Sequence, residues 1–153
     1  MQPAAAPQSI ATRPAVESDR AFVVDCFLRA MQPSLTARRG NWNPLQERER
    51  FERALDLDRT TIVLAGDAAV GFVVLVELRH VLQVHTIAVL PEHQGRGIGS
   101  EIIADVVNLG RQTGRAVVLS VLKVNVRAQA LYRRLGFEIR ESADDHHHMQ
   151  FAR

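Results

Sequence analysis

The chain contains a single cysteine, a single tryptophan and a single tyrosine among its 153 residues. Because Cys26 has no partner, a disulfide framework is excluded, and we expect a reducing, cytoplasmic compartment. The sequence has no run of about 18 consecutive apolar residues, so no membrane span is expected. The formal net charge is only +2, too small for the dense basic face of a nucleic-acid-binding protein, so neither a membrane nor a nucleic acid is an expected partner.

The remaining composition is that of one globular domain. Hydrophobic residues make up 46% of the chain and charged residues 24%, which is ordinary for such a domain and enough to bury one core without disulfides or metals. Residues 1–8, with two prolines and three alanines, are expected to form a flexible N-terminal arm. Residues 9–153 are then a single domain.

Hydrophobic periodicity predicts seven strands and about four helices. The strands are expected at residues 9–13, 60–65, 70–78, 81–89, 116–121, 137–141 and 146–151. The helices are expected at residues 18–30, 44–57, 98–113 and 126–135. Pro33 is expected to end the first helix, Asn43 to cap the second before Pro44, and Gly136 to follow the last. Short turns make the three strands between residues 60 and 89 antiparallel, whereas the strand-helix-strand unit around the third helix is parallel. The expected fold is therefore α+β, with a mixed, mostly antiparallel sheet.

Residues 94–100, Gln-Gly-Arg-Gly-Ile-Gly-Ser, connect the fourth of these strands to the third helix. Glycine at every second position lets the backbone turn tightly and approach a ligand closely. Free N–H groups at the start of the helix favour an anion such as phosphate, and Arg96 adds a positive charge. The alternative is a glycine-rich turn that only caps an ordinary helix. A P-loop is excluded because no lysine follows the glycines, and a Rossmann fingerprint is excluded because position 100 is Ser100.

Two motifs resemble those of the GNAT acetyltransferases. The first is the coenzyme A loop of that family, which reads Gln or Arg, two free positions, Gly, one free position and Gly or Ala; it matches Gln94, Gly97 and Gly99. The second is an Asn followed by an Ala, an aromatic residue and Gly-Phe; it matches Asn125, Ala128, Tyr132, Gly136 and Phe137. The predicted order of elements also resembles the GNAT fold, over residues 9–153.

The resemblance implies acetyl-coenzyme A as co-substrate, with its pantetheine arm along the strand at residues 81–89 and its pyrophosphate on the N–H groups of the glycine loop. Asn125 is expected to hydrogen-bond the pantetheine amides, and its alternative role is to cap the helix that follows. The residues expected to bind the cofactor are Ile87, Ala88, Val89, Gln94, Gly95, Arg96, Gly97, Ile98, Gly99, Ser100, Asn125 and Tyr132.

The resemblance places Tyr132 beside the coenzyme sulfur, as the acid that protonates the leaving thiolate. Packing of the Tyr132 ring in the core is the alternative. For the base, we expect Gln83, His85 and Ile87 to alternate onto one face of their strand. His85 is the first candidate, and Glu77 on the neighbouring strand is the second. A purely structural hydrogen bond of His85 is the alternative to both.

The side chains expected to contact the acceptor are Trp42, Gln83 and His148. For Trp42, which lies in a loop, anchoring of that loop to the surface of the protein is the alternative. Because side chains alternate along a strand, His146 and His148 share a face that His147 does not. Three histidine ligands therefore do not converge on one point, and no metal site is predicted.

The sequence thus predicts an enzyme that moves an acetyl group from acetyl-coenzyme A directly to the primary amine of a small molecule. Acetylation of a protein N-terminus or of a lysine is the alternative within this chemistry. A non-catalytic module that binds acyl-coenzyme A is the alternative of another class. Exposed edge strands are compatible with a homodimer.

Overall fold

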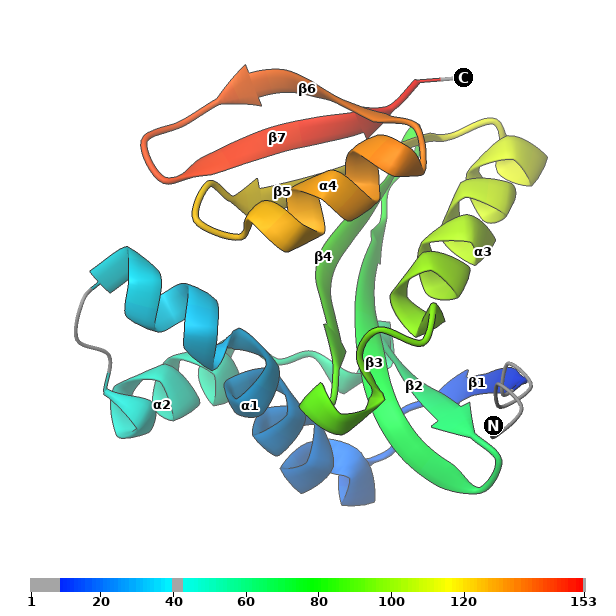
Figure 1. Ribbon diagram of the computed structural model, residues 1–153. Coiled ribbons are helices and arrows are strands. Elements are labelled where there is room, and N and C mark those ends of the chain that lie inside the picture. The colour runs from blue at the N-terminus through cyan, green and yellow to red at the C-terminus, as the bar shows by residue number, and fades with distance from the viewer. Residues whose placement is uncertain (1–8, 40–42, 153) are drawn as a thin grey trace, which may run out of the picture.

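A computed structural model of the protein describes residues 9–39 and 43–152. Within these residues the chain forms one seven-stranded sheet with four helices (Figure 1), which confirms the predicted α+β class. The strands are β1 (Ile10–Pro14), β2 (Thr60–Ala65), β3 (Ala68–Glu77), β4 (Val81–Val89), β5 (Ala116–Leu122), β6 (Phe137–Ser142) and β7 (His146–Phe151). The helices are α1 (Arg20–Arg39), α2 (Pro44–Ala54), α3 (Ile98–Thr113) and α4 (Val126–Arg134), and short 3₁₀ turns occupy Glu17–Asp19, Leu57–Arg59 and Pro91–His93.

The strands lie in the order β1-β2-β3-β4-β5-β7-β6. All neighbouring pairs are antiparallel except β4 and β5, which are parallel as predicted. The parallel pairing covers only residues 81–84 of β4 and residues 116–119 of β5, although β4 continues to Val89 and β5 to Leu122. The two strands therefore separate towards their carboxyl ends.

The first helix is longer than its sequence suggested. α1 continues through Pro33 to Arg39 instead of ending near Ala30. Pro33 is exposed, so water can satisfy the carbonyl of Arg29, which has lost its helical N–H donor. The prediction that Pro33 ends this helix is therefore wrong.

The start of α2 follows the prediction, but its end does not. The side chain of Asn43 accepts hydrogen bonds from the N–H groups of Leu45 (3.0 Å) and Gln46 (3.4 Å), as an N-cap residue before Pro44 does. The helix stops at Ala54, earlier than the predicted residue 57, which instead begins a separate 3₁₀ turn.

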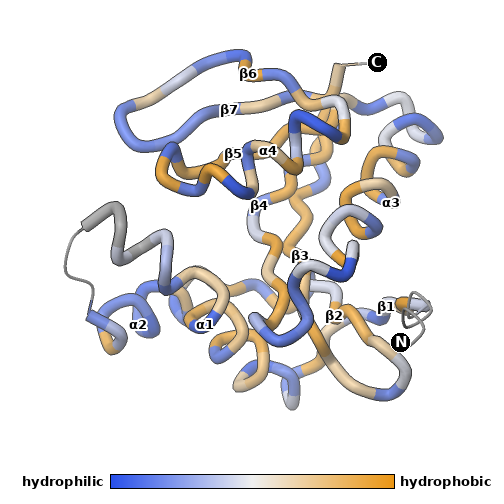
Figure 2. The backbone as a smooth tube through the Cα atoms, in the orientation of Figure 1, coloured by the Kyte–Doolittle hydropathy of each residue, from blue (hydrophilic) through white to orange (hydrophobic). Residues whose placement is uncertain are grey.

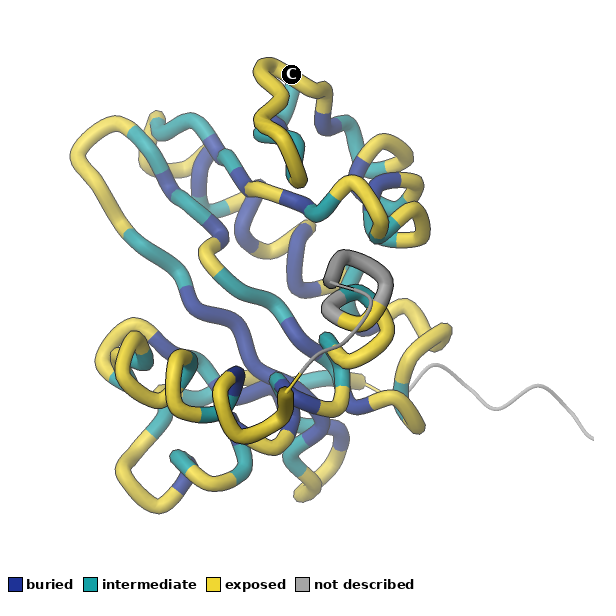
Figure 3. The backbone as a smooth tube through the Cα atoms, turned by 90° about the vertical axis from the view of Figure 1, so that its left-hand side faces the viewer, coloured by how far each residue is buried: buried dark blue, intermediate teal, exposed yellow. Residues whose placement is uncertain are grey.

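Helices cover both faces of the sheet, and each face has its own hydrophobic core. One core lies under α3 and α4 and includes Val63, Leu82, Val84, Ile103 and Met149. The other lies under α1 and α2 and includes Val23, Cys26, Ile62, Phe72 and Ala88. Figure 2 shows hydrophobic residues concentrated in β3 and β4, between the two helical layers, and Figure 3 shows the buried positions in the middle of the molecule with the outer sides of the helices exposed.

Cys26 is fully buried in the core under α1. Burial raises the pKa of its thiol to about 12, so the thiol stays protonated at neutral pH and is a poor nucleophile. Cys26 is therefore a small apolar core residue and not a nucleophile. In the described part of the chain, none of the helices combines the length and the hydrophobicity that crossing a membrane requires.

Gly110 sets the distance between α3 and the sheet. A Cβ atom at this position would lie 2.6 Å from Cγ2 of Val117 and 2.9 Å from the carbonyl oxygen of Arg115. We expect Gly110→Ala to lower the free energy of unfolding by about 1–2 kcal/mol in a urea titration, because overpacking outweighs the gain in helix propensity. The control is Asn108→Ala at an exposed position of the same helix, which should be neutral or slightly stabilising. Equal stability of the two variants would contradict the close packing.

Candidate functional site

The separation of β4 from β5 leaves the main chain of β4 unpaired on one side. Among the described residues, nothing pairs with β4 on the side of β5 beyond Val84, whereas β3 stays paired on the other side as far as Val89. An unpaired strand edge can bind an extended ligand through its N–H and C=O groups. We call residues 85–89 and the facing end of β5 the β4–β5 split.

A β-bulge marks the start of this split. Val74 of β3 lies opposite Thr86, but the next residue of β3, Leu75, lies opposite Val84. His85 is therefore the extra residue of a bulge in β4. A bulge of this kind bends the strand and increases its twist, which is consistent with β4 leaving β5 at this point.

The side chains of β4 exchange faces at the bulge. Leu82 and Val84 lie in the core under α3, but Ala88, which would share their face in a regular strand, lies in the core under α1. Ile87 packs against the core under α3, and Gln83 points to the opposite face because it alternates with Leu82 and Val84. The prediction that Gln83, His85 and Ile87 alternate onto one face of the strand is therefore wrong, because Gln83 and Ile87 lie on opposite faces.

The glycine loop, residues 94–100, has the geometry of an anion site. Gly95 and Gly97 have φ angles of 79° and 82°, in the left-handed region where a side chain is strained. Within the described chain, no group accepts a hydrogen bond from a main-chain N–H between positions 95 and 100, and the helical pattern begins where the N–H of Glu101 donates to the Gly97 carbonyl (3.0 Å). Free donors at the N-terminus of a 16-residue helix favour phosphate oxygens.

Two contacts outside the loop hold it in place. The side-chain Nε2 of Gln94 donates to the carbonyl of Val89 (2.9 Å) and so ties the loop to the end of β4. In the turn just before the loop, Glu92 forms an ion pair with Arg29 of α1 (2.7 Å). Gln94, predicted to bind the cofactor, thus has a structural role in shaping the loop.

Arg127 belongs to this site, although no sequence pattern pointed to it. A Cβ atom on Gly95 would lie 3.5 Å from Nη2 of Arg127, so the guanidinium of this α4 residue lies beside the glycine loop. Both Arg127 and the loop's own Arg96 are exposed, and in the described residues neither has an acidic partner. The Arg127 guanidinium therefore lies beside the loop with the free N–H groups, and Arg96 adds a second cationic residue within the loop itself.

We expect Arg127→Gln to raise the dissociation constant of coenzyme A about tenfold or more, because a hydrogen bond to a charged group contributes about 1.5–3 kcal/mol. Isothermal titration calorimetry with coenzyme A measures this dissociation constant. The control is Arg134→Gln at the other end of α4, which should leave the affinity unchanged. Equal affinities of the two variants would exclude a contact between Arg127 and the phosphates.

Asn125 caps α4, as its alternative role required. Its side-chain oxygen accepts a hydrogen bond from the N–H of Ala128 (3.2 Å), which leaves the side-chain NH₂ as a donor towards a ligand. The turn before it is fixed by Gln129, whose Nε2 donates to the carbonyls of Leu122 (3.0 Å) and Lys123 (2.8 Å). The end of β5 and the start of α4 are therefore held rigidly beside the split.

Tyr132 combines core packing with a free hydroxyl. Its side chain is 8% exposed, and its ring lies 6.0 Å from that of Phe137. Among the described residues the hydroxyl has no hydrogen-bond partner. Burial raises the pKa of Tyr132 to about 12, so the phenol stays protonated at neutral pH and can donate a proton.

Of the two candidate bases, only His85 lies at the split. It is exposed, and its Nδ1 lies 3.0 Å from Oγ1 of the adjacent Thr86. Glu77 lies opposite Leu82, at the paired end of β4, and its carboxylate meets Arg115 (3.2 Å). The structure therefore does not bring Glu77 to the split.

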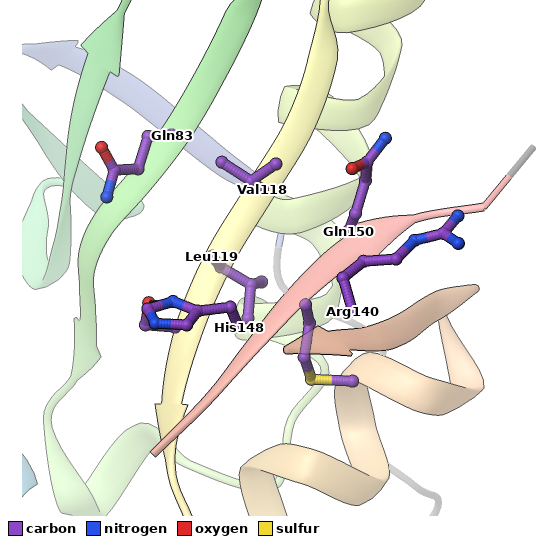
Figure 4. Close-up of a pocket in the computed structure, with 8 residues that line it drawn as sticks. Gln83, Val118, Leu119, Arg140, His148 and Gln150 are labelled. Atoms are coloured by element: carbon purple, nitrogen blue, oxygen red, sulfur yellow. Dashed lines mark hydrogen bonds between the residues drawn. The ribbon is translucent and has the colours of Figure 1, made fainter. Parts of the chain in front are cut away.

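Gln83 and His148, both predicted to contact the acceptor, line one pocket of about 170 Å³. We call it the β5–β7 pocket; its lining residues are Gln83, Val118, Leu119, Ser120, Arg140, His148, Met149 and Gln150. Because Leu119 and Met149 belong to the core under α3, their neighbours along β5 and β7 face the opposite side of the sheet. Figure 4 shows the His148 ring extending from β7 across β5 towards β4. Trp42, the third predicted contact, lies outside the described residues.

The three consecutive histidines of β7 alternate as predicted. His146 and His148 share a face, with ring centroids 4.7 Å apart, whereas Nδ1 of His147 lies 2.7 Å from Oγ of Ser142 on β6. His148 lines the β5–β7 pocket, His146 lies beside it on the same face of the sheet, and His147 lies on the opposite face.

The sequence is similar to a known family and to individual proteins that have been named as acetyltransferases. A model of the acetyltransferase (GNAT) family matches residues 26–137. An uncharacterized N-acetyltransferase of Methanocaldococcus jannaschii is 40% identical over 67 residues, which is 43% of this chain and 30% of that protein. The N-alpha-acetyltransferase RimI of Mycobacterium tuberculosis is 45% identical over 56 residues, 37% of this chain and 34% of that protein. The match thus spans about a third of each of these curated relatives.

The fold also matches solved structures over nearly the whole chain. The PaiA N-acetyltransferase from Thermoplasma acidophilum, solved in complex with coenzyme A, superimposes with a TM-score of 0.77 at 16% identity, covering 95% of this chain and 99% of that one. At this level of identity the similarity establishes the fold and leaves the chemistry to the residues of the site.

Proposed function

Because this chain belongs to the acetyltransferase (GNAT) family, we propose that it transfers the acetyl group of acetyl-coenzyme A directly to a primary amine. The observation that carries the proposal is the glycine loop, whose main-chain N–H groups have no acceptor in the described chain and lie beside Arg127. A diphosphate suits such donors at a helix N-terminus. The unpaired edge of β4 suits the extended pantetheine arm, which carries amide groups.

The residues around the split have distinct tasks in this reaction. The main-chain N–H of Ile87 or Val89 hydrogen-bonds and polarises the thioester carbonyl. Tyr132 supplies a proton to the leaving sulfur, a contribution of about 10²- to 10⁴-fold in rate. Holding both reactants in one orientation contributes more, about 7–11 kcal/mol. Precise positioning by β4, the glycine loop and α4 is therefore the larger part of catalysis.

The acceptor approaches from the β5–β7 pocket, where Gln83 and His148 contact it. Our first candidate is the amine of a small molecule. A second candidate, the α-amine of a protein N-terminus, is favoured by the similarity to the N-alpha-acetyltransferase RimI. Both acceptors present the same reacting group, a primary ammonium that must lose a proton before it attacks.

An acceptor screen tests the proposal. The protein is incubated with acetyl-coenzyme A and with polyamines, amino-acid amides, short peptides with free N-termini, or N-terminally blocked lysine peptides, and thiol release and acetylated products are measured. Turnover of small amines alone supports the first candidate, and turnover of free N-termini alone supports the second. Tight coenzyme binding without acetylation of any amine would contradict the enzyme and leave a module that only binds acyl-coenzyme A.

A further inference from the structure

We propose that His148 is the general base of this reaction and that Ser120 positions its ring. The inference rests on the proposed function and adds to it the group that removes a proton from the acceptor. It replaces His85 as the first candidate. His85 is exposed beside its own chain neighbour, whereas His148 lies in a pocket and is oriented by residues of two strands.

The first support is the contact between Ser120 and His148. They are partners in the β5–β7 ladder, and Oγ of Ser120 lies 2.8 Å from Nδ1 of His148. Ser120 directly follows Leu119, the last residue of β5 that pairs with β4. The pair therefore stands where the β4–β5 split begins, on the face that holds the β5–β7 pocket.

The second support for the proposal is the contact between the ring of His148 and the ring of His146. Nδ1 of His146 lies 2.7 Å from a carboxylate oxygen of Asp145, and the His146 ring meets the His148 ring edge-on at 88°. Asp145 thus holds His146, and His146 holds His148. In the described residues Nε2 of His148 has no partner, so this nitrogen is the one left for a ligand.

The charged and titratable groups around the ring come from several strands. On β6, Glu141 lies opposite His148, and Arg140 lines the pocket with its guanidinium 3.7 Å from Glu138. On β7, the neighbour is His146 with its carboxylate partner; the group from β4 is the neutral amide of Gln83. Because Arg140 has an acidic neighbour, the pocket can admit an ammonium group next to Nε2.

The reaction removes two protons from the acceptor nitrogen and places one proton on the sulfur. With Nδ1–H donating to Oγ of Ser120, Nε2 carries a lone pair and takes one proton from the acceptor's ammonium. The freed nitrogen lone pair forms the C–N bond to the acetyl carbon, and the C–S bond breaks. The sulfur takes the phenolic proton of Tyr132, and the acceptor nitrogen's second proton restores the phenol. His148 then releases its proton to solvent, so the net products are the amide, the free thiol and one proton.

The test compares two histidine–serine pairs that share strand β7. With the best acceptor of the screen, His148→Gln should lower kcat about 10²-fold or more, and Ser120→Ala should lower it less. His147→Gln and Ser142→Ala alter the matching pair on the opposite face (2.7 Å) and should leave kcat unchanged.

A second readout needs no activity. The ¹⁵N shifts of the imidazole in the free protein should show a proton on Nδ1 and none on Nε2 of His148, and Ser120→Ala should abolish this preference. A proton fixed on Nε2, or equal kcat values for His148→Gln and His147→Gln, would overturn the inference while leaving the proposed function intact. Absence of acetylation by the unsubstituted protein would instead remove the proposed function, and this inference with it.

Discussion

Tyr132→Phe is expected to lower turnover about 10²- to 10⁴-fold, the usual contribution of a general acid. The substitution removes only the hydroxyl, which has no partner among the described residues, and it keeps the ring that packs 6.0 Å from Phe137. Stability and the affinity for coenzyme A should therefore stay unchanged. Steady-state kinetics, thermal unfolding and a coenzyme titration measure the three quantities.

The pH dependence of the unsubstituted protein gives an independent check of this role. Because burial raises the pKa of Tyr132 to about 12, the acid form persists at neutral and mildly alkaline pH, and activity that depends on it is lost only as the pH rises through about 12. No decline of kcat from this group is expected between about pH 8 and about pH 10. Unchanged turnover in Tyr132→Phe would contradict the acid role and leave only the packing of the ring.

Gly97→Ala is expected to raise the dissociation constant of coenzyme A about 10²-fold. Gly97 has a φ of 82°, which costs an L-residue about 1–2 kcal/mol, so the loop relaxes and its N–H groups lose their common direction. Two charge-assisted hydrogen bonds at about 1.5–3 kcal/mol each are enough for a change of this size. Calorimetric titration of both proteins with coenzyme A measures it.

The chain offers a matched control for this glycine. Gly66, in the turn between β2 and β3, also has a positive φ, 62°, and a Cβ atom there would likewise meet nothing within 4 Å. Gly66→Ala should therefore cost a similar amount of stability and leave the affinity for coenzyme A unchanged. If both variants bind coenzyme A as tightly as the unsubstituted protein, the glycine loop does not hold the phosphates.

Local sequence patterns predicted correctly those features that depend on residues within one helix, strand or turn. Asn43 before Pro44 predicted the start of α2, and three glycines before an apolar helical pattern predicted the loop and the start of α3. The pairing of β4 with β5 followed from the helix between them. These features depend on residues close together in the chain, so periodicity and capping rules reach them.

The features that the sequence did not reveal depend on contacts between distant segments. The bulge at His85 arises from pairing with β3. Helices cover both faces of β4 beyond the bulge, so apolar side chains occur on both faces. The hydrophobic pattern of the sequence therefore does not show where the side chains change faces. Arg127 meets Gly95, and Ser120 meets His148, only after the sheet has formed. A pattern rule that looks along one element cannot find such pairs.

The bulge also bears on how this protein tolerates changes of length. Side chains in a strand have a period of two, so losing one residue reverses all that follow. Deleting the bulge residue His85 would leave Leu82 and Ala88 an odd number of positions apart, so each would still face its present core. Deleting Ile87 instead would turn Ala88 towards the core that holds Leu82. The two cores therefore fix the number of residues in β4 beyond the bulge, and insertions or deletions there should be far more damaging than substitutions of the exposed residues of this strand.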